Sequence, residues 1–225
     1  MIKKGSQKEN FIASSSGSSS TKETVLLYER QLRDVAARIH TEVGQPLVAL
    51  KMKVEMLCSK ESSEDYKEIQ RLVGDIIKNI KNSISDLSSP LLYDFGLVPA
   101  LQWLINNFKN TEGVDISFHG DESPFTCDKD ISILLYRAIK ILLLRITDQL
   151  DPEEIAVEFM TDKNCVKISL LINTNNPPQQ LQSFIESRDV SIIMNWMDSI
   201  KGILSFKSLR EGKTRIILQC PLTLL

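Results

Sequence analysis

The chain has 225 residues, with 27 lysines and arginines against 29 aspartates and glutamates, so no strongly basic field favours nucleic acid. Its four cysteines form no Cys-x-x-Cys pair; with only two histidines they predict no zinc site, and they suit a reducing cytosol. The N-terminus lacks the apolar core of a signal peptide, and the most apolar run, 131–146, is too short to span a bilayer. We therefore expect a soluble, cytoplasmic protein with no membrane span.

Residues 1–20 are rich in serine, glycine and lysine and predict a flexible tail. A long amphipathic helix is expected over 21–60, because apolar residues recur three or four positions apart. This first seam consists of Leu32, Val35, Ile39, Val43, Leu47, Leu50, Val54 and Leu57. Pro46 lies inside the helix and should bend it about one turn after His40, because proline has no amide hydrogen.

A second long helix is predicted to end before Pro90. The polar turn 61–65 offers Ser62 or Ser63 as its N-cap. Its seam consists of Tyr66, Ile69, Val73, Ile76, Ile80, Ile84 and Leu87. Two such helices joined by a short turn form an antiparallel hairpin, which cannot cover both seams by itself. We favour pairing with a second copy as a dimeric four-helix bundle over folding of the hairpin onto the rest of the chain.

From Pro90 onward, helical and strand patterns alternate. Helices are expected over 97–108, 130–150 and 179–201, and strands over 114–118, 155–159, 166–172, 203–207 and 214–218. The pattern is typical of a two-layer sandwich, which makes the fold class α+β. The predicted division is a tail over 1–20, a helical hairpin over 21–89 and a sandwich over 90–225.

His40 lies beside Ile39, on the flank of the first seam. A histidine there is partly accessible to water and can offer a ring nitrogen as a nucleophile. Taken alone, a histidine in this position is more often an ordinary surface residue. His119, in a predicted loop, fits no motif and is interpreted as a surface residue.

The run His40-Thr41-Glu42-Val43-Gly44-Gln45 resembles the phosphoacceptor motif of sensor histidine kinases of the nitrate/nitrite-sensor type. The segment 89–104 resembles the start of their ATPase-like domain, and Gly212-Lys213-Thr214-Arg215 resembles its end. The resemblance covers the order of elements over about residues 25–222. It implies a dimerisation and phosphoacceptor hairpin followed by an ATPase-like domain.

The chain departs from the family where the family holds Mg-ATP. Ile141 and Arg145 stand where the resemblance places a glutamate and an asparagine, and hydrocarbon cannot coordinate magnesium. The loop 173–178 lacks the aspartate and glycines of the Asp-x-Gly-x-Gly motif, and 187–191 replaces a glycine-rich lid. We therefore predict no ATP binding and no cofactor of this chain's own, with Mg²⁺ supplied by a partner.

The phosphoacceptor region is altered too. The resemblance implies an acidic base directly after the histidine, where this chain has Thr41, and Glu42 lies about 100° further round the helix. Gln45, four residues from Thr41 and so on its face, is retained. The resemblance implies that this glutamine positions water against a phosphorylated aspartate of the response regulator. An ordinary exposed polar residue is an equally good interpretation of Gln45.

The sequence thus predicts a homodimeric histidine phosphotransfer protein of a two-component phosphorelay. It would exchange phosphoryl groups with response-regulator receiver domains through His40, without ATP-dependent kinase activity and without nucleic acid. One alternative is a phosphatase or sequestering regulator of a response regulator that acts through Gln45. A second is a non-catalytic dimeric adaptor. A working kinase requires an unfamiliar nucleotide geometry in place of the lost motifs.

Overall fold

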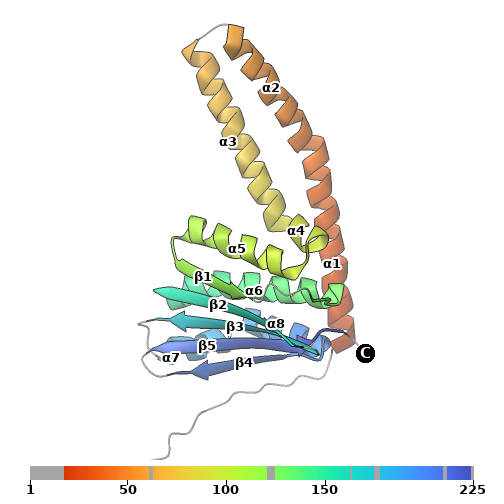
Figure 1. The fold of residues 1–225 in the computed structure, drawn as a ribbon, viewed down its shortest axis with the longest axis vertical. Coiled ribbons are helices and arrows are strands. Elements are labelled where there is room, and N and C mark those ends of the chain that lie inside the picture. The colour runs from red at the N-terminus through yellow and green to blue at the C-terminus, as the bar shows by residue number, and fades with distance from the viewer. Residues whose placement is uncertain are drawn as a thin grey trace, which may run out of the picture. The chain divides into compact units, whose positions relative to one another are not determined.

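A computed structural model describes residues 18–60, 63–120, 125–162, 164–174, 178–209 and 212–223 (Figure 1). The chain divides into two compact units. The helical unit is Val25–Tyr93, and the sheet unit is Asp94–Leu225 together with the residues up to Thr24. Most of the tail predicted over 1–20 lies outside the described residues.

The helical unit is built on one long, interrupted helix and its antiparallel neighbour (Figure 1). The elements are α1 (Ser18–Ile39), the π-helix His40–Gly44, α2 (Gln45–Lys60), α3 (Glu64–Leu87) and the short α4 (Pro90–Asp94). The two predicted helices are present, although the first begins three residues earlier than expected and α4 was not predicted. Ser63 is the N-cap of α3, because its Oγ accepts a hydrogen bond from the Asp65 amide at 3.2 Å.

Pro46 produces its bend as a five-residue π-helix, His40–Gly44, which we call the π-turn. An α-helix would need the Pro46 amide hydrogen to reach the Glu42 carbonyl, and the proline ring would clash with that oxygen. The Gln45 amide instead donates to the His40 carbonyl, five residues back. The turn therefore accommodates one more residue than an α-helical turn does.

The first seam separates into two rows. One row, Leu32, Ile39, Leu47 and Val54, is half-buried or buried. The other row consists of Val35, Val43, Leu50 and Leu57, and Tyr28, outside the predicted seam, extends it toward the N-terminus; these five residues are between 42% and 59% exposed. Steps within each row are seven residues, apart from one step of eight across the π-turn. On α3, Val73 is buried whereas Ile69, Leu72 and Ile76 are exposed, so the hairpin leaves a large apolar surface uncovered within one chain.

The sheet unit is a two-layer α+β sandwich, as the sequence predicts. Its helices are α5 (Leu97–Glu112), α6 (Lys129–Leu150), α7 (Pro178–Ile185) and α8 (Arg188–Ser199). Its strands are β1 (Asp115–Gly120), β2 (Glu154–Thr161), β3 (Cys165–Asn173), β4 (Ile203–Ser208) and β5 (Lys213–Pro221). The sheet order is β1-β2-β3-β5-β4, with β1 parallel to β2 and the other pairs antiparallel.

The core of the sheet unit lies between the helices and one face of the sheet. Alternate residues of β2, namely Ile155, Val157 and Phe159, are buried, and α6 contributes Leu134 and Ile139 with no exposed area. This alternation is the period of a strand with one covered face. None of the helices in the described ranges is both long and apolar enough to cross a membrane.

One predicted helix was wrong in extent. The segment 179–201 is two helices, α7 and α8, because a new helix begins after Ser187. The Ser187 Oγ accepts a hydrogen bond from the Val190 amide at 3.4 Å, and Asp189 places a negative charge in the first turn of α8. Both features favour a helix start at this point.

Candidate functional site

An apolar cleft of about 270 Å³ lies in the helical unit between the interrupted helix and α3. Its lining residues are His40, Gly44, Gln45, Leu47 and Val48 from the first helix, and Ile77, Ile80, Lys81 and Ile84 from α3. The two residues that the sequence nominates, His40 and Gln45, therefore line one cleft, and both side chains are exposed.

The π-turn explains why these two side chains share a cleft. In an α-helix, residues five apart lie about 140° from each other around the axis. Across the π-turn, the Gln45 amide bonds to the His40 carbonyl, so the two residues are one turn apart. The α-helical spacing that pairs Gln45 with Thr41 does not hold across this turn.

The side chain of His40 is exposed and belongs to the lining of the cleft. A Cβ at Gly44 would lie 3.7 Å from His40 Nδ1, so this nitrogen faces the backbone of the turn. Nε2 is the ring nitrogen further from the helix. Because the side chain is exposed, the imidazole is open to an approaching reactant.

Thr41 and Glu42, the two polar residues that follow His40, each form a hydrogen bond with a residue one helical turn closer to the N-terminus. The Thr41 hydroxyl donates to the Ala37 carbonyl at 3.0 Å. The Arg38 Nε donates to Glu42 Oε1 at 3.3 Å. Neither side chain is hydrogen-bonded to the imidazole, so the helix places no carboxylate base against His40.

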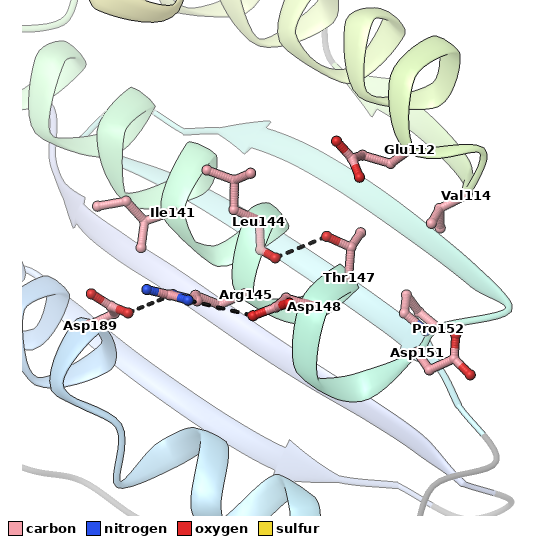
Figure 2. A pocket seen from close by; sticks show the side chains of 10 residues that line it. All are labelled: Glu112, Val114, Ile141, Leu144, Arg145, Thr147, Asp148, Asp151, Pro152 and Asp189. Carbon is pink, nitrogen blue, oxygen red and sulfur yellow. Dashed lines mark hydrogen bonds and ion pairs between the residues drawn. The ribbon is translucent and has the colours of Figure 1, made fainter.

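A second pocket, of about 730 Å³, lies in the sheet unit and contains both positions where the resemblance places Mg-ATP ligands (Figure 2). Ile141 presents only hydrocarbon there. Arg145 contacts Asp189 of α8, with 2.6 Å between Nε and Oδ2, and lies 3.5 Å from Asp148 Oδ2 (Figure 2). Arg145 thus ties α6 to the first turn of α8, within the segment 187–191 where the resemblance places a glycine-rich lid.

The lining of this second pocket is acidic. Its lining contains one guanidinium, that of Arg145, and four carboxylates, which belong to Glu112, Asp148, Asp151 and Asp189. A concave surface with this balance repels a polyphosphate and offers it a single cation. Within the described residues, no group of three or more His, Cys, Asp or Glu side chains is placed to hold a metal ion. Residues 175–177 of the loop 173–178 lie outside the described residues.

Two further candidates, Cys220 and His119, belong to the sheet unit and do not line the cleft. Burial, with smaller contributions from Cys127 and Cys165, raises the pKa of the Cys220 thiol to about 12. Such a thiol stays protonated near neutral pH and is a poor nucleophile. His119 is exposed on β1 rather than in a loop.

The order of elements and the hairpin with its exposed histidine define a histidine-kinase-like core, and comparison with known proteins confirms this interpretation. No family model matches the chain. It is 20% identical over 157 residues to the oxygen sensor histidine kinase NreB of Staphylococcus carnosus, covering 68% of this chain and 42% of that protein. It is 26% identical over 125 residues to the sensor histidine kinase ComP of Bacillus subtilis, covering 51% of this chain and 16% of that protein.

A third relative is the signal transduction histidine-protein kinase/phosphatase DegS of Brevibacillus brevis, 19% identical over 203 residues, which cover 87% of this chain and 52% of that protein. The chain spans about half or less of the length of these relatives. Among solved structures, the catalytic domain of histidine kinase ThkA aligns with a TM-score of 0.42 and 16% identity, over 57% of this chain and 93% of that one.

Proposed function

We propose that this protein is a histidine phosphotransfer protein of a two-component phosphorelay. His40 exchanges a phosphoryl group with the aspartate of a response-regulator receiver domain, and the protein has no ATP-dependent kinase activity. The observation that carries the proposal is the exposure of His40 and Gln45 in one cleft of a histidine-kinase-like hairpin.

The proposed reaction asks little of this chain. An accessible imidazole nitrogen is sufficient as the nucleophile, because positioning and charge stabilisation dominate catalysis of phosphoryl transfer. The receiver domain brings the phosphorylated aspartate and its Mg²⁺. The absence of a carboxylate base beside His40 is compatible with this role, since a neutral imidazole attacks without first losing a proton.

Two features of the sheet unit support the lack of kinase activity. Ile141 supplies no oxygen ligand for magnesium, and Arg145 is held by Asp189 and Asp148 in the second pocket. The four carboxylates of that pocket add a negative field that opposes a nucleotide. In this proposal the sheet unit serves as a scaffold.

The proposal includes a homodimer through the helical unit. Tyr28, Val35, Val43, Leu50 and Leu57 form an exposed row along the interrupted helix, and α3 exposes further apolar residues. Burying one such side chain completely contributes about 1.5 to 3 kcal/mol. A second copy matches the repeat of these rows, because hairpins with such seams associate as four-helix bundles.

Gln45 supports a second candidate function. Its amide lines the cleft beside His40, where it can both donate and accept hydrogen bonds and so orient water against a phosphoaspartate. A phosphatase or sequestering regulator of a response regulator would need Gln45 rather than His40. A non-catalytic adaptor would need neither side chain.

Phosphoryl acceptance from a panel of phosphorylated receiver domains tests the proposal. The unaltered protein should acquire an acid-labile phosphoryl group from its cognate receiver. His40→Ala should abolish acceptance while leaving dimerisation and docking intact, because an exposed residue contributes little packing. His119→Ala is the matched control, since it removes the other histidine, and it should accept phosphate normally.

The outcomes separate the candidate functions. Gln45→Ala should preserve transfer to His40 and slow the net loss of phosphate from the receiver. Unchanged acceptance by His40→Ala would contradict the phosphotransfer proposal. If Gln45→Ala alone blocks dephosphorylation, the phosphatase function takes its place. If neither change matters and the receiver still binds, only the adaptor is left.

A further inference from the structure

Lys81 stands on the α3 side of the cleft, opposite the helix that carries His40 and Gln45. We infer that Lys81 is a further catalytic residue: its ammonium group contacts the phosphoryl group as this group is transferred to His40 and while it stays there. The inference rests on the proposed function for its biological setting. Its chemistry can be tested without any partner protein.

The helical spacing of α3 directs Lys81 into the cleft. Ile77 lies four residues before Lys81 and Ile84 three residues after it, and all three line the cleft. Residues with this spacing share one face of a helix. The lysine stem can therefore lie along the aliphatic floor while its ammonium remains in water at the rim. Lys81 is exposed, as this arrangement requires.

Lys81 also provides the cationic side chain in the cleft lining that can attract an anion. Of the nine residues that line the cleft, three have polar side chains: His40, Gln45 and Lys81. Lys81 is the one lysine or arginine among them, and in the described part of the chain no ion pair engages it. The nearby cation on α1, Arg38, is paired with Glu42.

The transfer step shows where this charge is needed. The lone pair of a His40 ring nitrogen attacks the phosphorus of the receiver's aspartyl phosphate, so an N–P bond forms. The P–O bond to aspartate breaks, and its electron pair leaves with the carboxylate. The proton on the other ring nitrogen stays there. During the step, negative charge is spread over the three equatorial phosphoryl oxygens, and a positioned cation lowers the barrier by stabilising them.

The rest of the cleft lining could not provide this stabilisation. Five of the nine lining side chains are aliphatic, from Leu47, Val48, Ile77, Ile80 and Ile84. The Gln45 amide offers neutral hydrogen-bond donors only. An ammonium at the rim acts through partly screened Coulomb attraction, so its effect should weaken as salt is raised.

Phosphoramidate, which phosphorylates histidine directly, provides the test. Phosphorus NMR on the full chain would follow both the formation of phosphohistidine at His40 and its hydrolysis. Lys81→Gln keeps a long polar side chain without the charge, and Lys81→Arg restores a cation. Lys78→Gln is the matched control, because Lys78 is an exposed lysine of α3 that does not line the cleft.

At low salt, Lys81→Gln should slow formation of phosphohistidine about five- to tenfold, as expected for one partly screened charge. Lys81→Arg should restore most of the rate, and Lys78→Gln should match the unaltered protein. The deficit of Lys81→Gln should shrink at high salt. A phosphorylated receiver as donor should show the same order of variants.

Rates and lifetimes that are equal in Lys81→Gln and the unaltered protein at low salt would overturn the inference. An equal loss in Lys78→Gln would also overturn it, because the effect would then be general surface charge. Labelling of His40 by phosphoramidate without transfer from any receiver would instead defeat the proposed function and leave the role of Lys81 standing. Failure of phosphoramidate to label His40 would refute both.

Discussion

The helical unit and the sheet unit preserve different parts of one resemblance. In the helical unit, His40 and Gln45 are exposed at a cleft, where they can meet another molecule. In the sheet unit, helices and strands enclose an apolar core, but Ile141 and Arg145 stand where the resemblance places a glutamate and an asparagine. The difference teaches that a buried apolar pattern can maintain a fold whatever polar residues line its pockets, because packing and ligand chemistry reside in different side chains.

The largest effect is expected from charges placed in the α3 seam. Ile76→Asp combined with Ile80→Asp should give a monomer or an unfolded chain, because carboxylates cannot be buried unpaired in a bundle core. Sedimentation measures the mass. Ile203→Asp on β4 is the matched control, since Ile203 is 54% exposed and Ile76 is 46% exposed. This control should remain dimeric. A monomeric mass for the unaltered protein would refute the dimer.

The second largest effect is expected from a cavity created in the core of the sheet unit by truncating a buried side chain. Leu134 of α6 has no exposed area, so Leu134→Ala should lower the free energy of unfolding by about 2 to 5 kcal/mol. Denaturant titration followed by circular dichroism measures this loss. At temperatures where the variant is still folded, acceptance of phosphate by His40 should be unchanged. A parallel loss of acceptance would show that the sheet unit takes part in the chemistry.

The ion pair between Arg145 and Asp189 should contribute much less. Both side chains are partly exposed, at 42% and 31%, so screening by water reduces the attraction. A double-mutant cycle with Arg145→Gln and Asp189→Asn should give a coupling free energy of about 0.2 to 1 kcal/mol. The more exposed pair Lys109–Asp115 is the comparison and should couple more weakly. Coupling near zero would mean that the ion pair between Arg145 and Asp189 does not contribute to stability.

The smallest expected effect is none. Mg-ATP should not raise the melting temperature, because a ligand stabilises a protein only if it binds the native state. Differential scanning fluorimetry of this protein beside an ATP-binding histidine kinase measures the shift. An upward shift, or labelling of His40 by ATP, would contradict the prediction that the sheet unit lacks a nucleotide site.

Most of the fold follows from periodicity in the sequence. Alternation in β2 and β3 and the three-four spacing in α3 and α6 each report one covered face, so these elements could be predicted within a few residues. The apolar spacing stops between Ile185 and Val190, so the break between α7 and α8 has a signal in the sequence; it was missed because Ser187 was not recognised as the N-cap of a new helix. Short α4 has too few residues for a period to be recognised.

The candidate site was only half accessible to sequence reasoning. His40 and Gln45 are recognisable from the local motif, but their common cleft depends on the π-turn. A signal for that turn is present in the sequence: Val35 to Val43 and Ile39 to Leu47 are both steps of eight, directly before or across Pro46. Lys81 could not be found this way, because the packing of the two helices determines which of their residues face each other, and the sequence motif does not reveal that packing.

The eight-residue step gives the long helix two rotational phases. Upstream of His40, exposed residues of the row are seven positions apart, at Tyr28 and Val35. After the eight-residue step, the seven-residue repeat resumes at Val43 and continues with Leu50. A helical input segment grafted onto α1 must therefore be aligned with the upstream count. Alignment with the downstream count would place the segment one residue out of phase and rotate its apolar stripe by about 100° away from the stripe it should continue.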